Sequence, residues 1–361
     1  MALMTGVPPL QTFYVYLTSG CNCACRHCWI VPKAPGGNIV LDPPVLRRAI
    51  EQAMPLGLQS LKWTGGEPTL HPNLPRLLAI QKEFGLTASL ETNGLLVDSR
   101  LAELLRDSGV ASVSVSLDGA RVVTHDTIRG IAGGFARTCA GIRALVESGY
   151  RPELILTLQR SNVGEIDDYL ALAVSLGAGS VKLNVMQPLL RGAELAAQGE
   201  AMSVAEVLEV ARRLEDEWRI RCSVPVILDV PLAFRPLGTL LDGSAGGVCG
   251  ISRILGLLPT GDYALCGIGS YVNELIMGKV HVANLAGLWG SHPLLVRLRA
   301  GLPGGLRGIC GVCLMKAACR GNCVAANYHQ SADLFAPYWF CRAAADAGLF
   351  PASRRAGAQL E

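Results

Sequence analysis

The chain has 361 residues, of which 50% are hydrophobic and 17% are charged, and its formal net charge at pH 7 is +3. This length is sufficient for one large domain with a well-buried core and a smaller second domain, and the composition excludes a disordered protein. The small net charge gives no argument for a nucleic-acid partner or for binding to a membrane.

Thirteen cysteines stand out in this composition. The opening residues carry no basic segment of a secretory signal, and no uncharged apolar run reaches the length of a membrane span. Cysteines in a chain without a secretory signal are more typical of metal or redox sites than of disulfides. We therefore expect a cytoplasmic protein.

Short β-rich runs alternate with amphipathic stretches of helical length from about residue 13 to residue 185. This alternation predicts repeated βα units around a parallel sheet, and therefore an incomplete barrel. The expected strands cover residues 13–18, 60–64, 88–92, 112–117, 154–158 and 181–185. The expected helices cover residues 44–54, 74–84, 99–108, 134–148, 163–176 and 204–218.

Three cysteines follow the first predicted strand in one loop, at Cys21, Cys25 and Cys28. Soft thiolates select zinc, copper(I) or iron–sulfur clusters. A [4Fe-4S] cube has four irons, so three thiolates leave one iron open to a ligand that is not protein. The alternatives are a zinc site completed by His27 or Cys23, and a simple cysteine-rich turn.

Glycines and small polar residues follow the next three predicted strands. The motifs are Thr64-Gly65-Gly66-Glu67-Pro68, Glu91-Thr92-Asn93-Gly94 and Ser116-Leu117-Asp118-Gly119. Each motif alone is typical of a turn. Because the carboxyl ends of parallel strands meet at one edge of a sheet, the three motifs together predict a polar rim.

The cysteine loop and the rim motifs, together with His125-Asp126 and Arg129-Gly130, resemble the radical S-adenosylmethionine (SAM) enzymes over about the first 230 residues. The resemblance implies an α/β fold, a partial (βα)6 TIM-like barrel. It also implies that the three cysteines of the loop hold a [4Fe-4S] cluster. The open iron would be chelated by the amino and carboxylate groups of SAM.

The same resemblance implies how the charged groups of SAM are held. The backbone around Gly65 and Gly66 and the carboxylate of Glu67 would receive the SAM ammonium. Arg129 would pair with the SAM carboxylate, a bidentate geometry to which guanidinium is suited.

Other rim residues are implied in contacts with the rest of SAM. Ser116 and Asp118 would face the ribose or the sulfonium, and His27 and Trp29 would lie near the adenine. Weaker candidates for the same pocket are Asn93, Thr157, Asn184 and Arg191. Each of these four could equally satisfy backbone groups at a strand end.

Three further cysteines are not expected to bind a cluster. Cys23 stands where the family often has an apolar residue, but a fourth thiolate on the open iron would prevent SAM from binding. Cys139 and Cys222 are predicted to be small buried apolar residues.

Beyond about residue 235 the sequence shifts to short Gly-rich segments with seven more cysteines. They are Cys249, Cys266, Cys310, Cys313, Cys319, Cys323 and Cys341. The run from Cys310 to Cys323 is too dense in cysteine for packing alone. Thr260-Gly261-Asp262 predicts a hairpin turn before it, and a zinc ribbon is the alternative to an iron–sulfur site.

This pattern resembles the SPASM domain, a C-terminal extension of many radical SAM enzymes that binds two auxiliary [4Fe-4S] clusters. The resemblance implies two ligand sets: Cys310, Cys313, Cys319 and Cys341 for a closed cluster, and Cys249, Cys266 and Cys323 for a nearer one. Some members have a further cysteine where this chain has Leu255. The nearer cluster would therefore be open to a substrate atom, a water or a non-cysteine ligand.

The expected domains are a barrel over residues 1–235, a SPASM domain over 236–345 and a solvated C-terminal tail over 346–361. In the sulfatase-maturating members, an aspartate that serves as a catalytic base follows the second SPASM cysteine. This chain has Gly267 at that position, which disfavours the same reaction. The sequence names no replacement base, since Asp262, Tyr263 and Tyr271 are near in sequence only.

The expected activity is reductive cleavage of SAM to methionine and a 5′-deoxyadenosyl radical, which abstracts hydrogen from a substrate C–H bond. SPASM members mostly modify ribosomally made peptides, so we expect thioether formation, carbon–carbon cross-linking, backbone excision or epimerisation. The alternatives are a small-molecule substrate such as a tetrapyrrole, a non-catalytic iron–sulfur electron carrier, and a zinc-binding module.

The expected partners are a precursor peptide and a low-potential electron donor such as flavodoxin or ferredoxin, with no nucleic acid and no membrane. Only about a dozen residues precede the first predicted strand. We therefore expect leader recognition to fall to the barrel and SPASM surfaces or to a separate protein.

Overall fold

The computed structural model describes residues 6–30, 32, 38–241 and 248–357. The strands of the barrel are β1 (Thr12–Tyr16), β2 (Ser60–Thr64), β3 (Thr87–Thr92), β4 (Val110–Ser116), β5 (Glu153–Leu158), β6 (Ser180–Val185) and β7 (Val226–Asp229). The later strands are β8 (Ile254–Leu257), β9 (Asp262–Ala264) and β10 (Ile276–Lys279).

The helices of the first part are α1 (Pro43–Ala53), α2 (Leu74–Glu83), α3 (Ser99–Asp107), α4 (Val122–Arg129), α5 (Gly134–Glu147), α6 (Ile166–Ser175), α7 (Arg191–Ala197), α8 (Val204–Arg213), α9 (Arg219–Arg221) and α10 (Leu237–Leu241). Those of the C-terminal part are α11 (Leu285–Ser291), α12 (Pro293–Gly301), α13 (Gly308–Gly311), α14 (Lys316–Cys319), α15 (Val324–Ser331) and α16 (Trp339–Asp346). No helix in the described ranges combines the length and the apolar character needed to cross a membrane.

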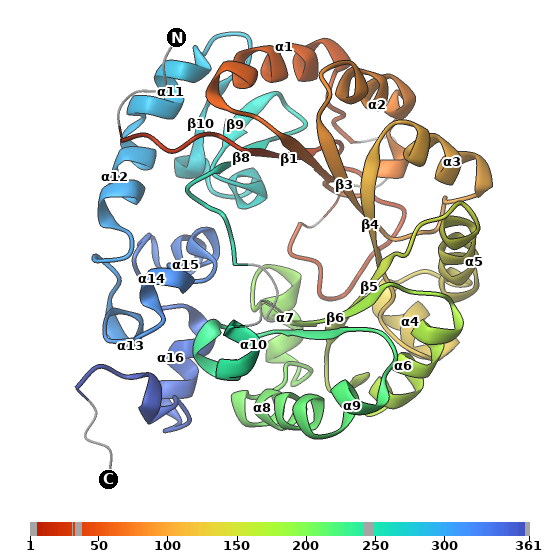
Figure 1. Ribbon diagram of the computed structural model, residues 1–361, viewed down its shortest axis with the longest axis vertical. Coiled ribbons are helices and arrows are strands. Elements are labelled where there is room, and N and C mark those ends of the chain that lie inside the picture. The colour runs from red at the N-terminus through yellow and green to blue at the C-terminus, as the bar shows by residue number, and fades with distance from the viewer. Residues whose placement is uncertain (1–5, 31, 33–37, 242–247, 358–361) are drawn as a thin grey trace.

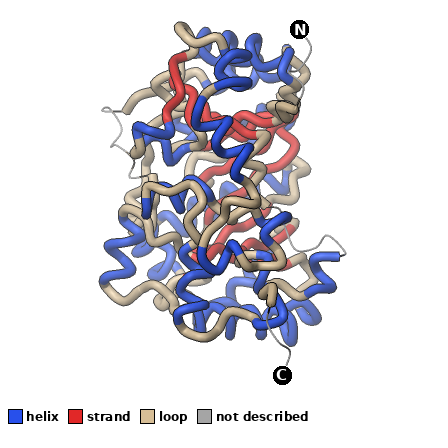
Figure 2. The backbone as a smooth tube through the Cα atoms, turned by 90° about the vertical axis from the view of Figure 1, so that its left-hand side faces the viewer, coloured by secondary structure: helices blue, strands red, loops and turns tan. Residues whose placement is uncertain are grey.

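All ten strands form one sheet in the order β10-β9-β8-β1-β2-β3-β4-β5-β6-β7. The strands from β1 to β7 are parallel, and the sheet curves into an open barrel with helices on its outer side (Figure 1). Figure 2 shows the strands gathered in one central band. The predicted incomplete α/β barrel is confirmed.

The predicted strands and helices agree with the observed ones to within two residues at most ends. The predicted helix over 204–218 is α8 followed by one turn of π-helix, Leu214–Trp218, and the helix over 163–176 begins as a 3-10 turn, Val163–Glu165. Within the barrel, β7, α4, α7, α9 and α10 were not predicted. Each has only three to eight residues, too short for a hydrophobic period to be read reliably.

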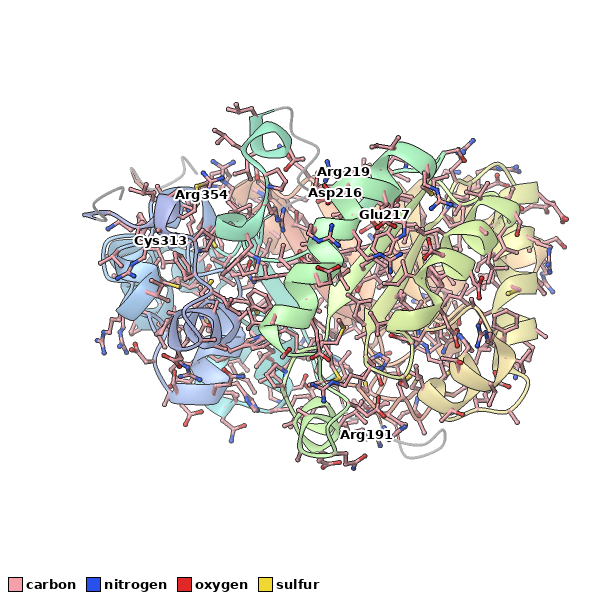
Figure 3. The ribbon with its side chains drawn as sticks, turned by 90° about the horizontal axis from the view of Figure 1, so that it is seen from below. Arg191, Asp216, Glu217, Arg219, Cys313 and Arg354 are labelled. Atoms are coloured by element: carbon pink, nitrogen blue, oxygen red, sulfur yellow. The ribbon has the colours of Figure 1, made fainter. Side chains whose placement is uncertain are left out.

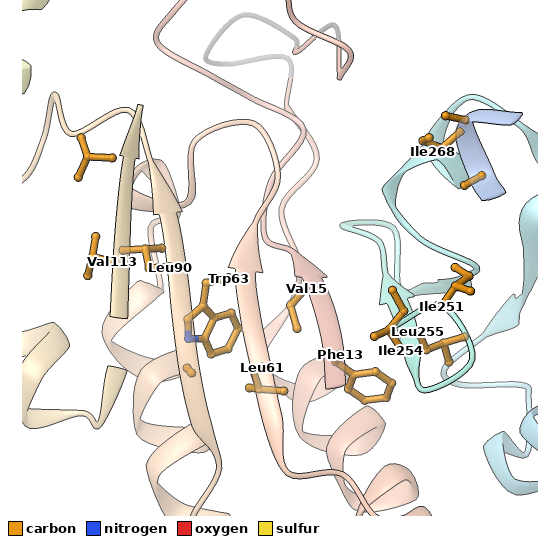
Figure 4. Close-up of a cluster of buried hydrophobic side chains, with 14 of the residues drawn as sticks. Phe13, Val15, Leu61, Trp63, Leu90, Val113, Ile251, Ile254, Leu255 and Ile268 are labelled. Atoms are coloured by element: carbon orange, nitrogen blue, oxygen red, sulfur yellow. The ribbon is translucent and has the colours of Figure 1, made fainter. Parts of the chain in front are cut away.

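Alternate residues of the strands face the helices and form the main core. Figure 4 shows Phe13, Val15, Leu61 and Trp63 in this layer, and all four are at most 1% exposed. Strand side chains alternate between the two faces of a sheet. The residues between these, such as Lys62, therefore point to the interior of the barrel.

The C-terminal part continues the barrel sheet. Strand β8 pairs in parallel with β1, with Thr12 opposite Ile254. Strands β8 and β9 form an antiparallel hairpin whose turn contains Gly261 at φ +77°, at the place where the sequence predicts a turn. Leu255 is fully buried in the shared core, so it points away from the interior of the barrel.

Part of the expected solvated tail packs back on the molecule. The backbone N–H of Leu314 donates to the carbonyl of Arg354 at 2.9 Å, and Arg355 forms a β-bridge with Cys313. The Arg354 guanidinium donates to the carbonyl of Arg235 at 3.3 Å, and Figure 3 shows Arg354 close to Cys313. Residues 351–357 are therefore anchored next to a cysteine of the second group.

Candidate active site

The cysteine loop lies at the carboxyl end of β1, over the opening of the barrel. Two backbone hydrogen bonds, from Ala24 to Arg129 at 3.0 Å and from Arg26 to Ile128 at 2.9 Å, fasten the loop to the end of α4. Cys21, Cys25 and Cys28 line a cavity of about 320 Å³ there. The three sulfurs are thus presented to one volume.

Most of the residues that the sequence assigned to SAM line this same cavity. They are His27, Trp29, Gly65, Gly66, Glu67, Asn93, Ser116, Arg129, Thr157 and Asn184. Asp118 and Arg191 are not in the lining. The carboxyl ends of six strands therefore meet here, as the βα pattern requires.

The two glycines after β2 are required by a close backbone approach. A Cβ on Gly66 would lie 2.0 Å from the carbonyl oxygen of Gly20, and Gly65 has φ +124°. The N–H of Gly66 donates to Thr18 at 2.8 Å and that of Glu67 to Gly20 at 2.9 Å. No side chain fits between the rim of β2 and the cysteine loop.

Glu67 joins two rim loops through its carboxylate and is only 1% exposed. Its Oε1 accepts hydrogen bonds from the backbone N–H and hydroxyl of Thr69 and from the hydroxyl of Thr92. Its Oε2 accepts one bond, from the N–H of Asn93 at 2.8 Å. Since a carboxylate oxygen has two lone pairs, Oε2 keeps one acceptor position for an ammonium group.

Arg129 connects the rim to the cysteine loop. Its Nη1 donates to the sulfur of Cys25 at 3.3 Å, and its Nε lies 2.8 Å from Oδ2 of Asp118. Its Nη2 is buried and has no hydrogen-bond partner within the described ranges. A buried guanidinium nitrogen left over in a cavity wall fits a ligand carboxylate.

Asp118 lies behind Arg129 and not in the cavity wall, so the expected direct contact with ribose or sulfonium is not supported by its position. Its side chain is fully buried, and its Oδ1 accepts from the N–H of Thr157 at 2.8 Å. Burial alone raises the pKa of Asp118, but the charge of Arg129, together with His27 and the hydrogen bond from Thr157, leaves the pKa below its ordinary value. Asp118 therefore positions the guanidinium.

Two of the remaining predicted contacts hold the loop itself. The His27 ring lies 3.2 Å from the Gln159 amide and 3.7 Å from Asp118. Arg191 is half-buried at the start of α7, where it donates to the carbonyl of Cys25 at 3.4 Å (Figure 3). Its position is therefore on the outer side of the loop.

Cys23 lies among the loop cysteines but does not line the cavity. It is 8% exposed, and the Asn93 amide donates to its sulfur at 3.4 Å. A hydrogen bond from Cys23 lowers the pKa of Cys25, and the nearby charge of Arg129 lowers it further against the effect of burial. These contacts favour the thiolate form of Cys25, which is the form that binds metal.

His125 makes the stability of this region depend on pH. Its ring accepts from the N–H of Asp118 at 3.1 Å, and burial followed by the charge of Arg129 lowers its pKa to about 4. Because the folded-state pKa lies below the unfolded value of about 6.5, stability is complete above pH 6.5 and is lost as the pH falls towards 4.

At pH 4.5 this effect should cost about 2.5 kcal/mol of unfolding free energy relative to pH 7. Chemical denaturation of the wild type and of His125→Asn at both pH values measures it, since asparagine does not titrate. An equal loss of stability in both proteins would contradict this assignment.

A second cavity, of about 490 Å³, lies between the barrel and the C-terminal part. Cys249, Cys266 and Cys323 line it together, as the resemblance implied for the nearer auxiliary cluster. Leu255 is absent from its wall. Leu255, which stands where some family members have a further cysteine, therefore does not reach this cavity.

A third, narrow cavity of about 10 Å³ is lined by the other four cysteines, Cys310, Cys313, Cys319 and Cys341. The thiols of Cys310 and Cys341 are in hydrogen-bond contact there. The structure thus sorts the seven C-terminal cysteines into the two predicted groups. Four soft thiolates around one point suit an iron–sulfur cluster.

In the described part of the chain, no three His, Cys, Asp or Glu side chains are arranged around one single metal ion. A [4Fe-4S] cube distributes its thiolates over different irons and does not require such an arrangement.

The first and second cavities share a wall. Five residues line both, Trp29, Thr64, Glu91, Gln187 and Asp229. A molecule bound across this wall would contact the cysteine-loop cavity and the auxiliary cavity at the same time.

Charged residues of the barrel interior are the part of the site that sequence reasoning missed. Lys62, Lys182, Glu91 and Asp229 line the second cavity. Their signal in the sequence is a charged residue at an alternate position of a strand, as in Ser60-Leu61-Lys62-Trp63-Thr64. None of the residues considered as a base from sequence, Asp262, Tyr263 and Tyr271, lines either cavity.

Comparison with known proteins agrees with this geometry. Residues 15–173 match the family model described as the radical SAM superfamily. The chain is 27% identical over 363 residues to an AdoMet-dependent heme synthase of Methanosarcina barkeri, covering 94% of this chain and 98% of the relative. It is 28% identical over 328 residues to the mycofactocin maturase MftC of Mycobacterium ulcerans, covering 89% and 85%.

Among solved structures, Streptococcus suis SuiB bound to its precursor peptide SuiA is similar, with a TM-score of 0.72 and 16% identity over 93% of this chain and 76% of SuiB. This likeness supports the fold. The part of the barrel that matches the radical SAM model carries the three-cysteine loop and the polar rim, and the chain is therefore an enzyme of the radical SAM type.

Proposed function

We propose that this enzyme is a radical SAM maturase with two auxiliary [4Fe-4S] clusters, which modifies a residue of a ribosomally made peptide. The modification would be a thioether or carbon–carbon cross-link, a backbone excision or an epimerisation. The observation that carries the proposal is the wall shared by the cysteine-loop cavity and the cavity of Cys249, Cys266 and Cys323.

The residues of the first cavity fit SAM and a three-thiolate cluster. Cys21, Cys25 and Cys28 would hold the cluster, the free lone pair on Glu67 would receive the SAM ammonium, and Nη2 of Arg129 would receive its carboxylate. Bound there, SAM and the cluster supply the 5′-deoxyadenosyl radical. The chain itself orients these groups and limits the access of water.

The second cavity is of a size for a polar side chain and its neighbours. It combines charged residues of the barrel with apolar ones such as Ile251, Ile254 and Ile268. Similar relatives include a mycofactocin maturase and a PqqA peptide cyclase, and a similar structure was solved with a precursor peptide. Both support a peptide as the substrate class.

The test is anaerobic reconstitution followed by incubation with SAM, a reductant and candidate precursor peptides. The proposal predicts 5′-deoxyadenosine formation coupled to a change in peptide mass. Metal analysis should give about twelve irons per chain for three cubes. Zinc in their place, with no SAM cleavage, would contradict the proposal.

A tetrapyrrole or related cofactor precursor is the second candidate substrate. It is favoured by the match to an AdoMet-dependent heme synthase along 98% of that relative. The same assay separates the two candidates. A mass change in an iron-coproporphyrin-type substrate, with none in any peptide, would support the second.

We further propose that a low-potential flavodoxin or ferredoxin delivers the electron. We also propose that a separate protein takes part in recognition of the leader of the precursor peptide. Pull-down of the peptide with and without a candidate leader-binding protein tests the second point.

A further inference from the structure

Two lysine–carboxylate pairs stand on the inner face of the barrel. Lys62 on β2 lies 2.6 Å from Glu91 on β3, and Lys182 on β6 lies 3.3 Å from Asp229 on β7. In each pair the lysine is opposite the residue two positions before the carboxylate on the neighbouring strand. The carboxylates therefore stand nearer the rim than the lysines.

Because the carboxylates stand nearer the rim, they and the lysines line different parts of the two cavities. Both carboxylates belong to the wall shared by the two cavities, whereas both lysines line the second cavity alone. Trp29, Thr64 and Gln187 complete the shared wall, and none of the three is ionisable at neutral pH. Among the described residues, Glu91 and Asp229 are therefore the two carboxylates that a substrate lying across the wall would meet.

The bond-forming reactions under the proposed function release a proton at this place. After a hydrogen atom has been removed from a substrate carbon, that carbon radical bonds to an atom Y of a second group Y–H. The new C–Y bond forms, the Y–H bond breaks, and one proton and one electron are released. The nearer auxiliary cluster, held by its cysteines, would accept the electron, and the proton needs a base within hydrogen-bond reach.

Glu91 is poorly suited to accept this proton. Its Oε1 is held by Lys62, and its Oε2 accepts from the Thr64 hydroxyl at 3.1 Å. Although burial raises the pKa of Glu91, the charge of Lys62 and these hydrogen bonds leave it below the ordinary value. Its proton affinity is therefore reduced, and both oxygens are engaged.

Asp229 is held more loosely. Its Oδ2 lies 3.3 Å from Lys182 and its Oδ1 lies 3.5 Å from Arg235, and its side chain is 41% exposed, close to the 37% of Glu91. The other titratable groups that face it are Cys249, Cys323 and Tyr338, whose pKa values its charge helps to raise after the larger effect of burial. Its contacts are thus longer than those of Glu91, and it is the more loosely held of the two carboxylates, beside the thiols that would hold the nearer auxiliary cluster.

We propose that Asp229 is the catalytic base that takes the proton from the Y–H group of the substrate as the new bond forms. Proton and electron then leave the substrate on the same side, towards the second cavity. This inference rests on the proposed function, and it supplies the base that this chain lacks after Cys266.

The test compares Asp229→Asn with Asp262→Asn in the reconstituted full-length enzyme. Asp262 is a matched aspartate at the tip of the β8–β9 hairpin, outside both cavities. For Asp229→Asn, 5′-deoxyadenosine formation should remain within about threefold of wild type, while modified peptide falls by about 10²-fold or more. The ratio of the two products should be unchanged in Asp262→Asn.

Two further readouts do not depend on turnover. The affinity for the peptide and the EPR signals of the reduced clusters should be the same in Asp229→Asn as in wild type. Asp229→Glu should recover part of the modified peptide, since it restores a carboxylate.

Each of the following results would overturn the role assigned to Asp229. An unchanged product ratio in Asp229→Asn, or an equal fall of both products, would overturn the assignment. Loss of one auxiliary-cluster signal would identify Asp229 as a cluster ligand and would overturn it as well. If the wild-type enzyme modifies no peptide at all, the proposed function fails and this inference falls with it.

Discussion

Replacement of Cys25 by alanine should abolish SAM cleavage and leave about eight of about twelve irons per chain. Cys25 is the most enclosed thiol of the three, at 6% exposure, and it is the one bonded to Arg129. Its loss removes a ligand from a cube that already has an open iron. Measurement of 5′-deoxyadenosine and of iron content after anaerobic reconstitution tests both parts of this expectation.

The effect should be confined to the first cavity. The cysteines of the second and third cavities lie on other segments, so their absorbance and EPR signals should persist in the variant. Cys222→Ala is the matched control, because Cys222 lines none of the three cavities. If SAM cleavage survived in Cys25→Ala, the assignment of the loop would be wrong.

Replacement of Arg129 by methionine should lower the free energy of unfolding by about 3–5 kcal/mol. Asp118 is fully buried, and its main charge partner is Arg129 at 2.8 Å, so the variant leaves a carboxylate buried without compensation. The loss of Nη2 should also weaken SAM binding by at least about tenfold. Chemical denaturation and equilibrium SAM binding measure the two effects.

Two controls distinguish the buried pair from charge removal in general. Arg212→Met breaks pairs with Glu209 and Asp216 in which all three side chains are more than half exposed, and it should cost about 1 kcal/mol or less. Adding Asp118→Leu to Arg129→Met should restore part of the lost stability, since it removes the uncompensated charge. An Arg129→Met protein as stable as wild type would show that the pair does not hold the rim.

The sequence determined the repeating architecture because that information is local. The period of apolar residues in β2 or α8 and the turn at Gly261 are present in short windows of the chain. The motifs after β1 to β4 sit at strand ends, whereas the two groups of C-terminal cysteines and the expected SAM contacts were implied by the family resemblance. The rule that strand ends share one edge was enough to bring these motifs together.

Only the tertiary structure decided which side chains of those motifs reach the cavity. Asp118 belongs to the motif, but Arg129 and the N–H of Thr157 turn its carboxylate inward. Arg191 likewise faces the back of the cysteine loop. Such competition between partners distant in sequence leaves no trace in the spacing of residues.

The tertiary structure also decided what lies between the cavities. Strand β7 is short. Asp229 lines the second cavity only because β7 pairs with β6 and the C-terminal part joins β1 through β8. These pairings connect residues that are far apart in the chain, and no local pattern encodes them. The sequence alone therefore determined the cofactor chemistry, whereas the packing of distant strands decided where a substrate and its proton acceptor meet.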